Sequence, residues 1–259
     1  MKGQSMTAHD ARMGQSAPLY NSVAPLRNVS ALATLLDRLE SRTAGLPGMG
    51  CFYGPSGYGK TSAAIFATNT FRAVNVQVQS TWSGKFLCQQ ILRELGETPK
   101  GTIAGLVARI CELLAIQDVP LIIDEADHLV RRQMIEIVRD IYEGSAVPVV
   151  LIGEEEMPQK LRQWERVHNR ILSWVPAEQA SLSDLHHLVP IYAPGIGIDP
   201  DLAEAILRAS GGSIRRICVN LNTAAEMART RNLDAVDLAA WGSAPFFTGS
   251  APAARRGLA

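Results

Sequence analysis

The sequence predicts an α/β fold in which a parallel β-sheet is sandwiched by helices and followed by a small C-terminal helical lid. Three observations support this prediction. Short β-branched runs, which are expected to be strands, alternate with helix-like runs as far as about Ala177. The β-branched runs are apolar on both faces, and after Ala177 the sequence shows only helical periodicity. Strands that are apolar on both faces are buried on two sides, and strands separated by helices imply right-handed parallel crossovers.

The composition suits an ordinary globular protein, because 47% of the 259 residues are hydrophobic and 19% are charged. We expect a flexible N-terminal tail over residues 1–27, an α/β domain over 28–177, a helical lid over 178–242 and a flexible C-terminal tail over 243–259. Both expected tails are rich in small residues and lack a clear period.

The elements follow in order along the chain. Ser30 is expected to cap a first helix, whose leucines repeat at helical spacing up to Gly45. Strands are expected at Met49–Tyr53, Val74–Val78, Val119–Ile123, Val147–Ile152 and Ile171–Val175. Helices are expected near 60–70, 83–95, 102–116 and 129–142, and then in the lid near 182–192, 199–210, 213–230 and 234–241. Ser83 and Gly96 are expected to bound the second of these helices.

A glycine-rich loop follows the first predicted strand. Residues 54–61 read Gly-Pro-Ser-Gly-Tyr-Gly-Lys-Thr and fit the pattern G-x-x-x-x-G-K-[ST], with a strand before them and a helix after them. The backbone N–H groups of such a loop converge on phosphate oxygens, Lys60 would bridge the β- and γ-phosphates, and Thr61 would offer its hydroxyl to Mg²⁺. We therefore expect ATP to be bound by Gly54, Pro55, Ser56, Gly57, Tyr58, Gly59, Lys60, Thr61 and Ser62.

Two adjacent acids end the third predicted strand. Asp124 and Glu125 follow Leu-Ile-Ile, and the carboxyl ends of strands border the ligand crevice of an open α/β sheet. Asp124 is placed to hold Mg²⁺, directly or through water, and Glu125 to activate the water that attacks the γ-phosphate. The alternative of an acidic helix N-cap would suit Asp127, but it does not explain a pair of acids that ends a buried strand. The loop and the acid pair together predict an ATPase.

The order of these elements resembles that of the AAA+ ATPases over roughly residues 28–240. In that family the ATP site is completed by an arginine of the lid, a polar residue ending the next strand, and an arginine finger from a neighbouring subunit. Gly-Ser-Ile-Arg-Arg at 212–216 resembles the lid motif, with Arg215 the better match and Arg216 the alternative. Arg170, before the last strand, resembles the finger, and Arg166 is the second choice.

One position departs from the AAA+ pattern. Relatives usually place Asn, Thr or Ser after the fourth strand, whereas this chain has three consecutive glutamates that begin at Glu154. Carboxylates would repel the γ-phosphate unless they turn away from it or bind metal. The residue that senses the γ-phosphate is therefore left unassigned, and slow hydrolysis is one expectation.

Within the AAA+ ATPases, the compact layout and the lid motif resemble the transposition ATPases, which include the B protein of Mu-like phages and transposon target-selection regulators. At 259 residues, we expect this chain to lack the N-terminal helix-turn-helix domain of the best-known member. The resemblance implies that ATP-bound subunits form a filament or ring on duplex DNA without sequence preference, then recruit and stimulate a transposase.

Any DNA contact must come from a local patch, because Lys plus Arg equals Asp plus Glu at 25 each. The resemblance points to the segment after the second strand, where Lys85 is the first candidate for a phosphate contact and Lys100 a weaker one. Arg131 and Arg132, beyond the acid pair, are further candidates.

Two alternatives stay open. An AAA+ helicase loader or secretion-type ATPase would have other partners, and a P-loop small-molecule kinase would transfer phosphate to a metabolite rather than to water. The four cysteines form no CxxC pair, which argues against a zinc site and a disulfide framework. No segment approaches the roughly 18 apolar residues of a membrane span, so we expect a cytoplasmic protein without a membrane partner.

Overall fold

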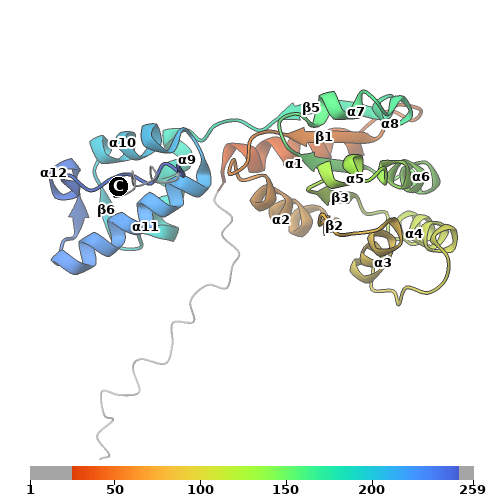
Figure 1. Cartoon of the computed structure of the whole chain (residues 1–259), viewed down its shortest axis with the longest axis horizontal. Helices are drawn as coiled ribbons and strands as arrows, with labels where there is room; N and C mark the ends of the chain where they lie inside the picture. The colour runs from red at the N-terminus through yellow and green to blue at the C-terminus, as the bar shows by residue number, and fades with distance from the viewer. Residues whose placement is uncertain (1–24, 251–259) are drawn as a thin grey trace, which may run out of the picture.

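The computed structural model describes residues 25–250, so most of the two expected tails, at 1–24 and 251–259, lies outside the described residues. Figure 1 shows an α/β body that holds the main sheet and a smaller helical body beside it. The two bodies are joined by the chain that leaves strand β5 and leads into helix α9.

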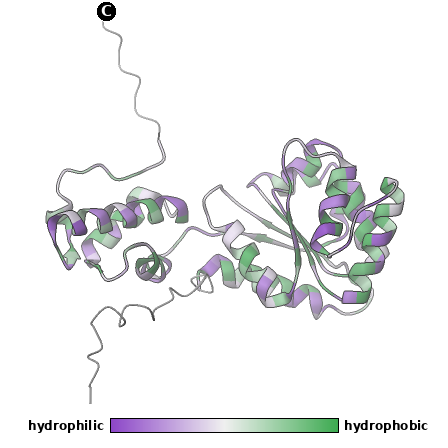
Figure 2. Ribbon diagram, turned by 90° about the horizontal axis from the view of Figure 1, so that it is seen from below, coloured by the Kyte–Doolittle hydropathy of each residue, from purple (hydrophilic) through white to green (hydrophobic). Residues whose placement is uncertain are grey.

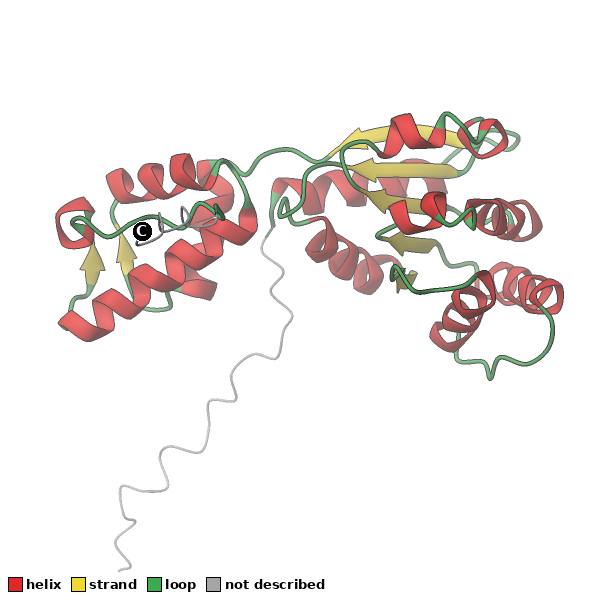
Figure 3. Cartoon of the chain, in the orientation of Figure 1, coloured by secondary structure: helices red, strands yellow, loops and turns green. Residues whose placement is uncertain are grey.

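Five strands form the main sheet in the order β2-β3-β4-β1-β5, and every neighbouring pair is parallel, which confirms the predicted fold class. The carboxyl ends of all five strands point toward the helical body (Figure 3). β3 and β4 begin two residues later than expected because Pro120 and Pro148, which have no N–H to donate, precede them. The strands are β1 (Met49–Tyr53), β2 (Val74–Gln77), β3 (Leu121–Asp124), β4 (Val149–Gly153) and β5 (Ile171–Pro176).

Helices cover both faces of the sheet. Successive strand residues point to opposite faces, so Phe52 and Ile152 belong to one buried core, whereas Cys51 and Leu151 belong to the other. The first core contains residues of α1, α2 and the lid, and the second contains residues of α3, α4 and α6. The hydropathy colouring of Figure 2 is mostly hydrophobic on the strands and mixed on the helices, as expected for a sheet buried on two sides.

The helices of the α/β body largely follow the sequence pattern. Ser83 caps α3 by accepting a hydrogen bond from the N–H of Phe86, and Gly96 follows its end with a left-handed φ of +79°, as expected. The helices are α1 (Arg27–Glu40), α2 (Lys60–Phe71), α3 (Gly84–Glu94), α4 (Ile103–Gln117), α5 (Asp127–Arg131), α6 (Ile135–Ser145), α7 (Met157–Leu161) and α8 (Glu165–His168).

The expected start of the first helix was wrong. α1 begins at Arg27 after Leu26, and Ser30 lies inside it rather than at its cap. No local side chain caps this helix; instead the N–H of Arg27 donates to Asp184 Oδ1 of the lid at 2.8 Å. A carboxylate distant in sequence therefore accepts the hydrogen bond of a helix N-terminal N–H that a neighbouring cap residue normally accepts.

The single helix expected near 129–142 is two helices, α5 and α6. Gln133 between them has a φ of +59°, a left-handed conformation that interrupts helical hydrogen bonding. The interruption leaves Leu129 and Ile135 both fully buried in the core that also holds α3 and α4.

The helical body contains two short strands that the sequence pattern did not predict. β6 (Gly197–Ile198) and β7 (Ala235–Val236) pair in parallel and hold together the ends of the lid helices. At two residues each, they are too short for period-2 alternation to reveal them. The lid helices are α9 (Leu182–Tyr192), α10 (Pro200–Ser210), α11 (Ile214–Arg231) and α12 (Leu238–Trp241).

Residues after α12 pack against the lid. Phe246 stacks on Trp241 with ring centroids 4.6 Å apart, and the buried amide of Asn220 exchanges hydrogen bonds with the backbone of Phe247 at 3.0 and 2.8 Å. The expected division into domains stays a prediction, and these contacts extend the packed lid beyond residue 242.

Between residues 25 and 250, no helix combines the length and the apolar character that crossing a membrane requires.

Candidate functional site

The glycine-rich loop connects the end of β1 to the start of α2. Gly57 and Gly59 have φ angles of +86° and +82°, which L side chains rarely adopt. A Cβ on Gly57 would also lie 2.5 Å from Ser213 Oγ of the lid, so space as well as conformation requires glycine there. The loop therefore presents bare backbone at the N-terminus of a helix, an arrangement that binds phosphate.

Lys60 is the first residue of α2, and its ammonium group folds back over the loop. Its Nζ donates to the carbonyl oxygens of Gly54 at 2.6 Å and Pro55 at 2.9 Å. Burial lowers the pKa of Lys60 from its ordinary value, although nearby carboxylates, chiefly Asp124 and Glu125, act in the opposite direction. The cation thus lies between the loop and the acid pair.

Asp124 and Thr61 meet at the end of β3. Thr61 Oγ1 donates to Asp124 Oδ2 at 2.9 Å, and Asp124 Oδ1 accepts the N–H of Glu125 at 2.8 Å. A hydroxyl and a carboxylate side by side are oxygen ligands of the kind that Mg²⁺ prefers, with phosphate oxygens and water supplying the others. The residues present therefore fit the predicted metal, although no group of three or more His, Cys, Asp or Glu gathers at a metal-binding spacing within the described part of the chain.

Glu125 turns the chain sharply after the strand. Its φ of +55° is left-handed, a strained conformation for a residue with a side chain. Burial, and then the charge of Asp124, raise the pKa of Glu125, while His128 and Lys60 oppose them. A carboxylate with a raised pKa is a better proton acceptor, as a general base requires.

A cavity of about 360 Å³ lies between the loop, the acid pair and the lid. Arg215 lines it, and the backbone N–H of Arg215 donates to the carbonyl of Gly57 at 3.3 Å. Arg216 points elsewhere, since its guanidinium lies where a side chain on Gly249 would be. The cavity is lined by Ser56, Gly57, Gly59, Lys60, Thr61, Ser62, Asp124, Glu125, Gly153, Glu154, Tyr192, Ile214, Arg215, Cys218 and Val219.

Apart from Arg215, the lid side of this cavity was not identified from the sequence. Tyr192, Ile214, Cys218 and Val219 form it, and contact with the Cys218 thiol, together with burial, raises the pKa of Tyr192 to about 12. Helical spacing could have indicated two of the four, because Cys218 and Val219 lie one turn beyond Arg215 on the same face of α11. Tyr192 ends another helix, and no sequence pattern links it to the others.

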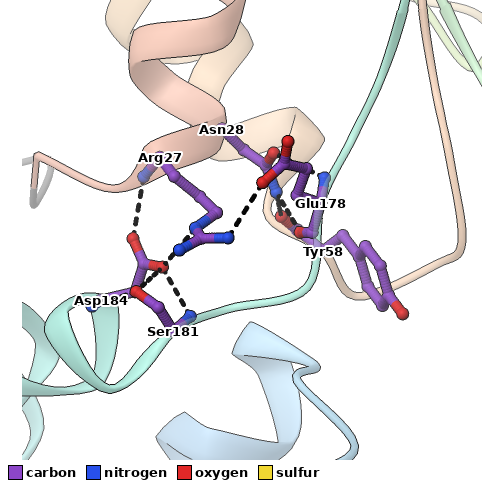
Figure 4. A network of polar contacts seen from close by, with 6 residues as sticks. All are labelled: Arg27, Asn28, Tyr58, Glu178, Ser181 and Asp184. Carbon is purple, nitrogen blue, oxygen red and sulfur yellow. Dashed lines mark hydrogen bonds and ion pairs between the residues drawn. The ribbon is translucent and has the colours of Figure 1, made fainter.

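A polar network joins the glycine-rich loop, the first helix and the start of the lid (Figure 4). Asn28 Nδ2 donates to the carbonyls of Tyr58 and Glu178, each at 2.8 Å, and Asn28 Oδ1 accepts the N–H of Glu178 at 2.9 Å. Arg27 bonds the carboxylates of Glu178 and Asp184 at 2.9 and 3.1 Å. The loop that faces the cavity and the linker to the lid therefore share one buried side chain, Asn28.

Asp127 does not cap α5, which corrects the N-cap alternative. It is the first residue of the helix, and its carboxylate instead accepts the N–H of Glu154 at 2.6 Å and pairs with Lys160 at 2.9 Å. This buried carboxylate thus connects the end of β3 with the end of β4. No local pattern revealed the contact, because it depends on two neighbouring strands being in register.

The remaining predicted residues lie outside the cavity lining. Arg170 precedes β5 and pairs with Glu143 of α6 at 2.7 Å, both half-exposed, and Arg166 is exposed on α8. Lys85 is exposed on α3, Lys100 is exposed between α3 and α4, and Arg131 and Arg132 are exposed at the end of α5. The chain alone brings neither finger candidate to its own cavity.

Comparisons with known proteins agree with this architecture. The sequence model of the family described as "AAA domain" matches residues 43–161. The structure resembles that of the Orc1 protein of Aeropyrum pernix in complex with DNA, with a TM-score of 0.62, 18% identity, and coverage of 86% of this chain and 66% of that one. It also resembles Cdc6p from Pyrobaculum aerophilum, with a TM-score of 0.58, 16% identity, and coverage of 85% and 66%.

The chain therefore spans about 66% of the length of each of these two structures. A search of curated protein sequences finds no match. The family match covers the glycine-rich loop and the acid pair, and the structural likeness extends over the lid as well. The chain thus matches the AAA domain model over residues 43–161 and has the P-loop AAA+ fold.

Proposed function

We propose that this chain is an ATPase that binds duplex DNA without sequence preference, oligomerises on it, selects target DNA and activates a transposase. One observation carries the proposal: the cavity brings together Lys60 and Thr61 from the start of α2, Asp124 and Glu125 from the end of β3, and Arg215 from α11. In this set, Lys60 and Arg215 are the cations for the phosphates, Thr61 and Asp124 are the ligands for Mg²⁺, and Glu125 is the base.

Each residue of the site has a definite part in phosphoryl transfer to water. Backbone N–H groups of the loop and Lys60 bind the phosphate oxygens, and Arg215 adds positive charge from the lid side. Mg²⁺, held by Thr61 and Asp124, would offset negative charge on the β- and γ-phosphates. Glu125 accepts the proton of the attacking water, for which its raised pKa suits it.

Adjacent Asp124 and Glu125 favour water over a metabolite as the acceptor, which is the reason to prefer an ATPase to a small-molecule kinase. Arg170 is proposed to act on the site of a neighbouring subunit, with Arg166 as the alternative. Activity would then depend on assembly, because the finger comes from another copy.

Exposed cations support DNA binding. Within residues 25–250, none of Lys85, Lys100, Arg131 and Arg132 forms an ion pair, so their charges are available for phosphates. Phe86, 36% exposed, lies beside Lys85 with Arg93 over its ring at 5.8 Å, which adds an aromatic surface to the same helix. The similarity to an Orc1 protein in complex with DNA also supports this part of the proposal.

The first experiment measures duplex binding by the full chain with ATP and Mg²⁺, with ADP, and with no nucleotide. We expect ATP-dependent binding to unrelated sequences, cooperative assembly visible by electron microscopy, and loss of both in Lys60→Ala. Affinity should fall about 10³-fold or more between 50 and 200 mM salt if six or more phosphates are contacted along a filament. ATP-independent assembly would overturn the proposal.

A second experiment tests the DNA surface. The double variant Lys85→Gln/Arg131→Gln should reduce the salt slope by about 1 to 2 per subunit, since each lost phosphate contact lowers it by ~0.9. The matched control is Arg208→Gln/Arg229→Gln, which removes two exposed cations from the lid. An equal change in both variants would contradict the proposed surface.

Target selection and transposase activation need their own test. We expect ATP-dependent stimulation of strand transfer by a transposase encoded beside this chain, with products concentrated on DNA that the chain covers. A helicase loader would instead bind a replicative helicase and show little duplex binding alone, and a kinase would label an added metabolite without stimulation by DNA. Either result would replace the corresponding part of the proposal.

A further inference from the structure

Three successive glutamates follow β4 beside the ATP cavity. Glu154 lines that cavity together with Lys60 and Glu125, and its charge acts on Lys60. A carboxylate at this place would repel the γ-phosphate, whose oxygens are also negative. Something in the fold has to offset Glu154 if the site is to bind ATP.

Lys160 lies on α7, close to the carboxylates of Asp127, Glu154 and Glu156. Its Nζ is 2.9 Å from Asp127 Oδ1, 3.7 Å from Glu154 Oε2 and 3.8 Å from Glu156 Oε2. The hydrogen bond to Asp127, followed by the charges of the three acids, raises the pKa of Lys160 despite opposing desolvation. The ammonium group therefore remains charged at neutral pH and interacts with three carboxylates.

Asp127 links this cation to the backbone at the end of β4. Its side chain is only 5% exposed, with Oδ1 on Lys160 and Oδ2 on the N–H of Glu154 at 2.6 Å. Gly153 makes the approach possible, because a Cβ there would lie 2.6 Å from Asp127 Oδ2. The link Lys160–Asp127–Glu154 therefore fixes the turn that carries the three glutamates.

The direction of the glutamates follows from this link. The side chains of Glu154 and Glu156 are 61% and 78% exposed, and their carboxylates lie 3.7 and 3.8 Å from the Lys160 ammonium. Their carboxylates are thus paired with one cation rather than left unpaired beside the phosphates.

We infer that Lys160 is a positioning residue of the ATP site, which holds Asp127 and offsets part of the negative charge of Glu154 so that the γ-phosphate is accepted beside an acidic turn. The inference rests on the proposed function, since it assumes that ATP occupies the cavity. It predicts an electrostatic effect specific to the third phosphate. A merely structural ion pair would instead change stability and leave the discrimination between ATP and ADP as it was.

The test measures equilibrium binding of Mg²⁺–ATP and Mg²⁺–ADP to the full chain by calorimetry. We expect Lys160→Gln to weaken the binding of Mg²⁺–ATP by about tenfold and that of Mg²⁺–ADP by less than about threefold, because only ATP brings a γ-phosphate near Glu154. Lys160→Arg, which keeps the charge, should stay near the parent chain. Arg162→Gln is the matched control, since it removes a neighbouring exposed cation.

The decisive variant is Lys160→Gln/Glu154→Gln. Removing the unpaired carboxylate should restore ATP binding to within about threefold of the parent chain. No recovery, or an equal loss for ADP, would overturn the inference. If Lys160→Gln fails to fold, Glu154→Gln alone decides: shielding by Lys160 predicts less than about threefold change, and a tenfold gain in ATP affinity would show that Glu154 is unshielded.

Failure of the proposed function gives a different result. Should the parent chain bind no Mg²⁺–ATP, or bind it equally well as Lys60→Ala, both the site and this inference fall. Should the parent chain bind ATP and lose it on Lys60→Ala while Lys160→Gln changes nothing, the inference alone falls.

Discussion

Asn28 Nδ2 donates a 2.8 Å hydrogen bond to the carbonyl of Tyr58, and so connects the first helix to the phosphate-binding loop. The same side chain holds Glu178, in the linker that leads to the lid, through two more hydrogen bonds. Asn28 is 3% exposed, so solvent does not compete for these bonds. The loop and the lid form opposite sides of the cavity, and the side chain of Asn28 holds both the loop and the linker to the lid in place.

Asn28→Ala should therefore destabilise the chain by about 2 to 3 kcal/mol, because it leaves buried backbone groups unpaired. It should also weaken ATP binding by about tenfold, since the lid arginine loses its fixed position over the loop. Thermal unfolding and calorimetry measure the two effects. Asn222→Ala, at an exposed amide that bonds Glu226, is the control and should do neither. An unchanged ATP affinity in Asn28→Ala would rule out the coupling of loop and lid.

Arg215 and Arg216 are adjacent but should behave differently. Arg215→Ala should raise the Kd for ATP by about tenfold or more, because it removes a cation from the cavity lining. Arg216→Ala should leave nucleotide affinity within about threefold, since its guanidinium lies near Gly249 on the lid. Fluorescent nucleotide titration of the two variants in parallel checks this, and the reverse order would reassign the sensor arginine.

Glu125→Gln should bind ATP yet hydrolyse it at least about 100-fold more slowly, because the amide cannot accept the proton of water. Turnover by the parent chain should rise with pH as Glu125 loses its proton. The rise should occur above the ordinary pH range for a glutamate, since burial raises the pKa of Glu125. Phosphate release from pH 4.5 to 8 gives the profile, with Glu204→Gln on the lid surface as control. A flat profile would exclude Glu125 as the base.

Arg170→Ala should lower turnover of the assembled protein on DNA by about 10³-fold, as expected for loss of an arginine finger. ATP affinity of the dilute, unassembled chain should hardly change, because Arg170 pairs with Glu143 outside its own cavity. Arg166→Ala in the same assay discriminates the two candidates. Mixing Arg170→Ala with Glu125→Gln subunits should restore some activity if the finger acts across subunits, and no recovery would argue against it.

Asp184 should make stability depend on pH in acid. Burial acts to raise its pKa, but hydrogen bonds from Ser181 and Arg27 and the charge of Arg27 lower it overall below its ordinary value of 3.8. Because this pKa is depressed in the folded protein, the contribution of Asp184 to the free energy of unfolding is fully present above pH 3.8. It is lost as the pH falls through the pKa of Asp184 in the folded protein. Asp184→Asn should therefore lose stability at pH 7 and show a smaller further loss below pH 4, measured by denaturant unfolding. Parallel pH curves for both proteins would contradict this.

Most strands and helices could be predicted because their signals are local. The apolar runs ending at Tyr53 and Asp124, and the Ser83 cap, depend on residues close in sequence. Errors arose where a distant partner changed a local preference. Asp184 satisfies the start of α1 in place of Ser30, and the register of β3 beside β4 draws Asp127 to Glu154.

The sequence by itself determined the chemistry at the carboxyl edge of the sheet, because the glycine loop and the acid pair are each contiguous motifs whose residue types suit phosphate and magnesium. Only the tertiary structure decided which side chains surround that chemistry. Asn28 contacts the glycine-rich loop, Tyr192 lines the cavity and Lys160 pairs with Asp127, each from a segment distant in sequence. Such long-range packing leaves no periodic signal in the order of residues.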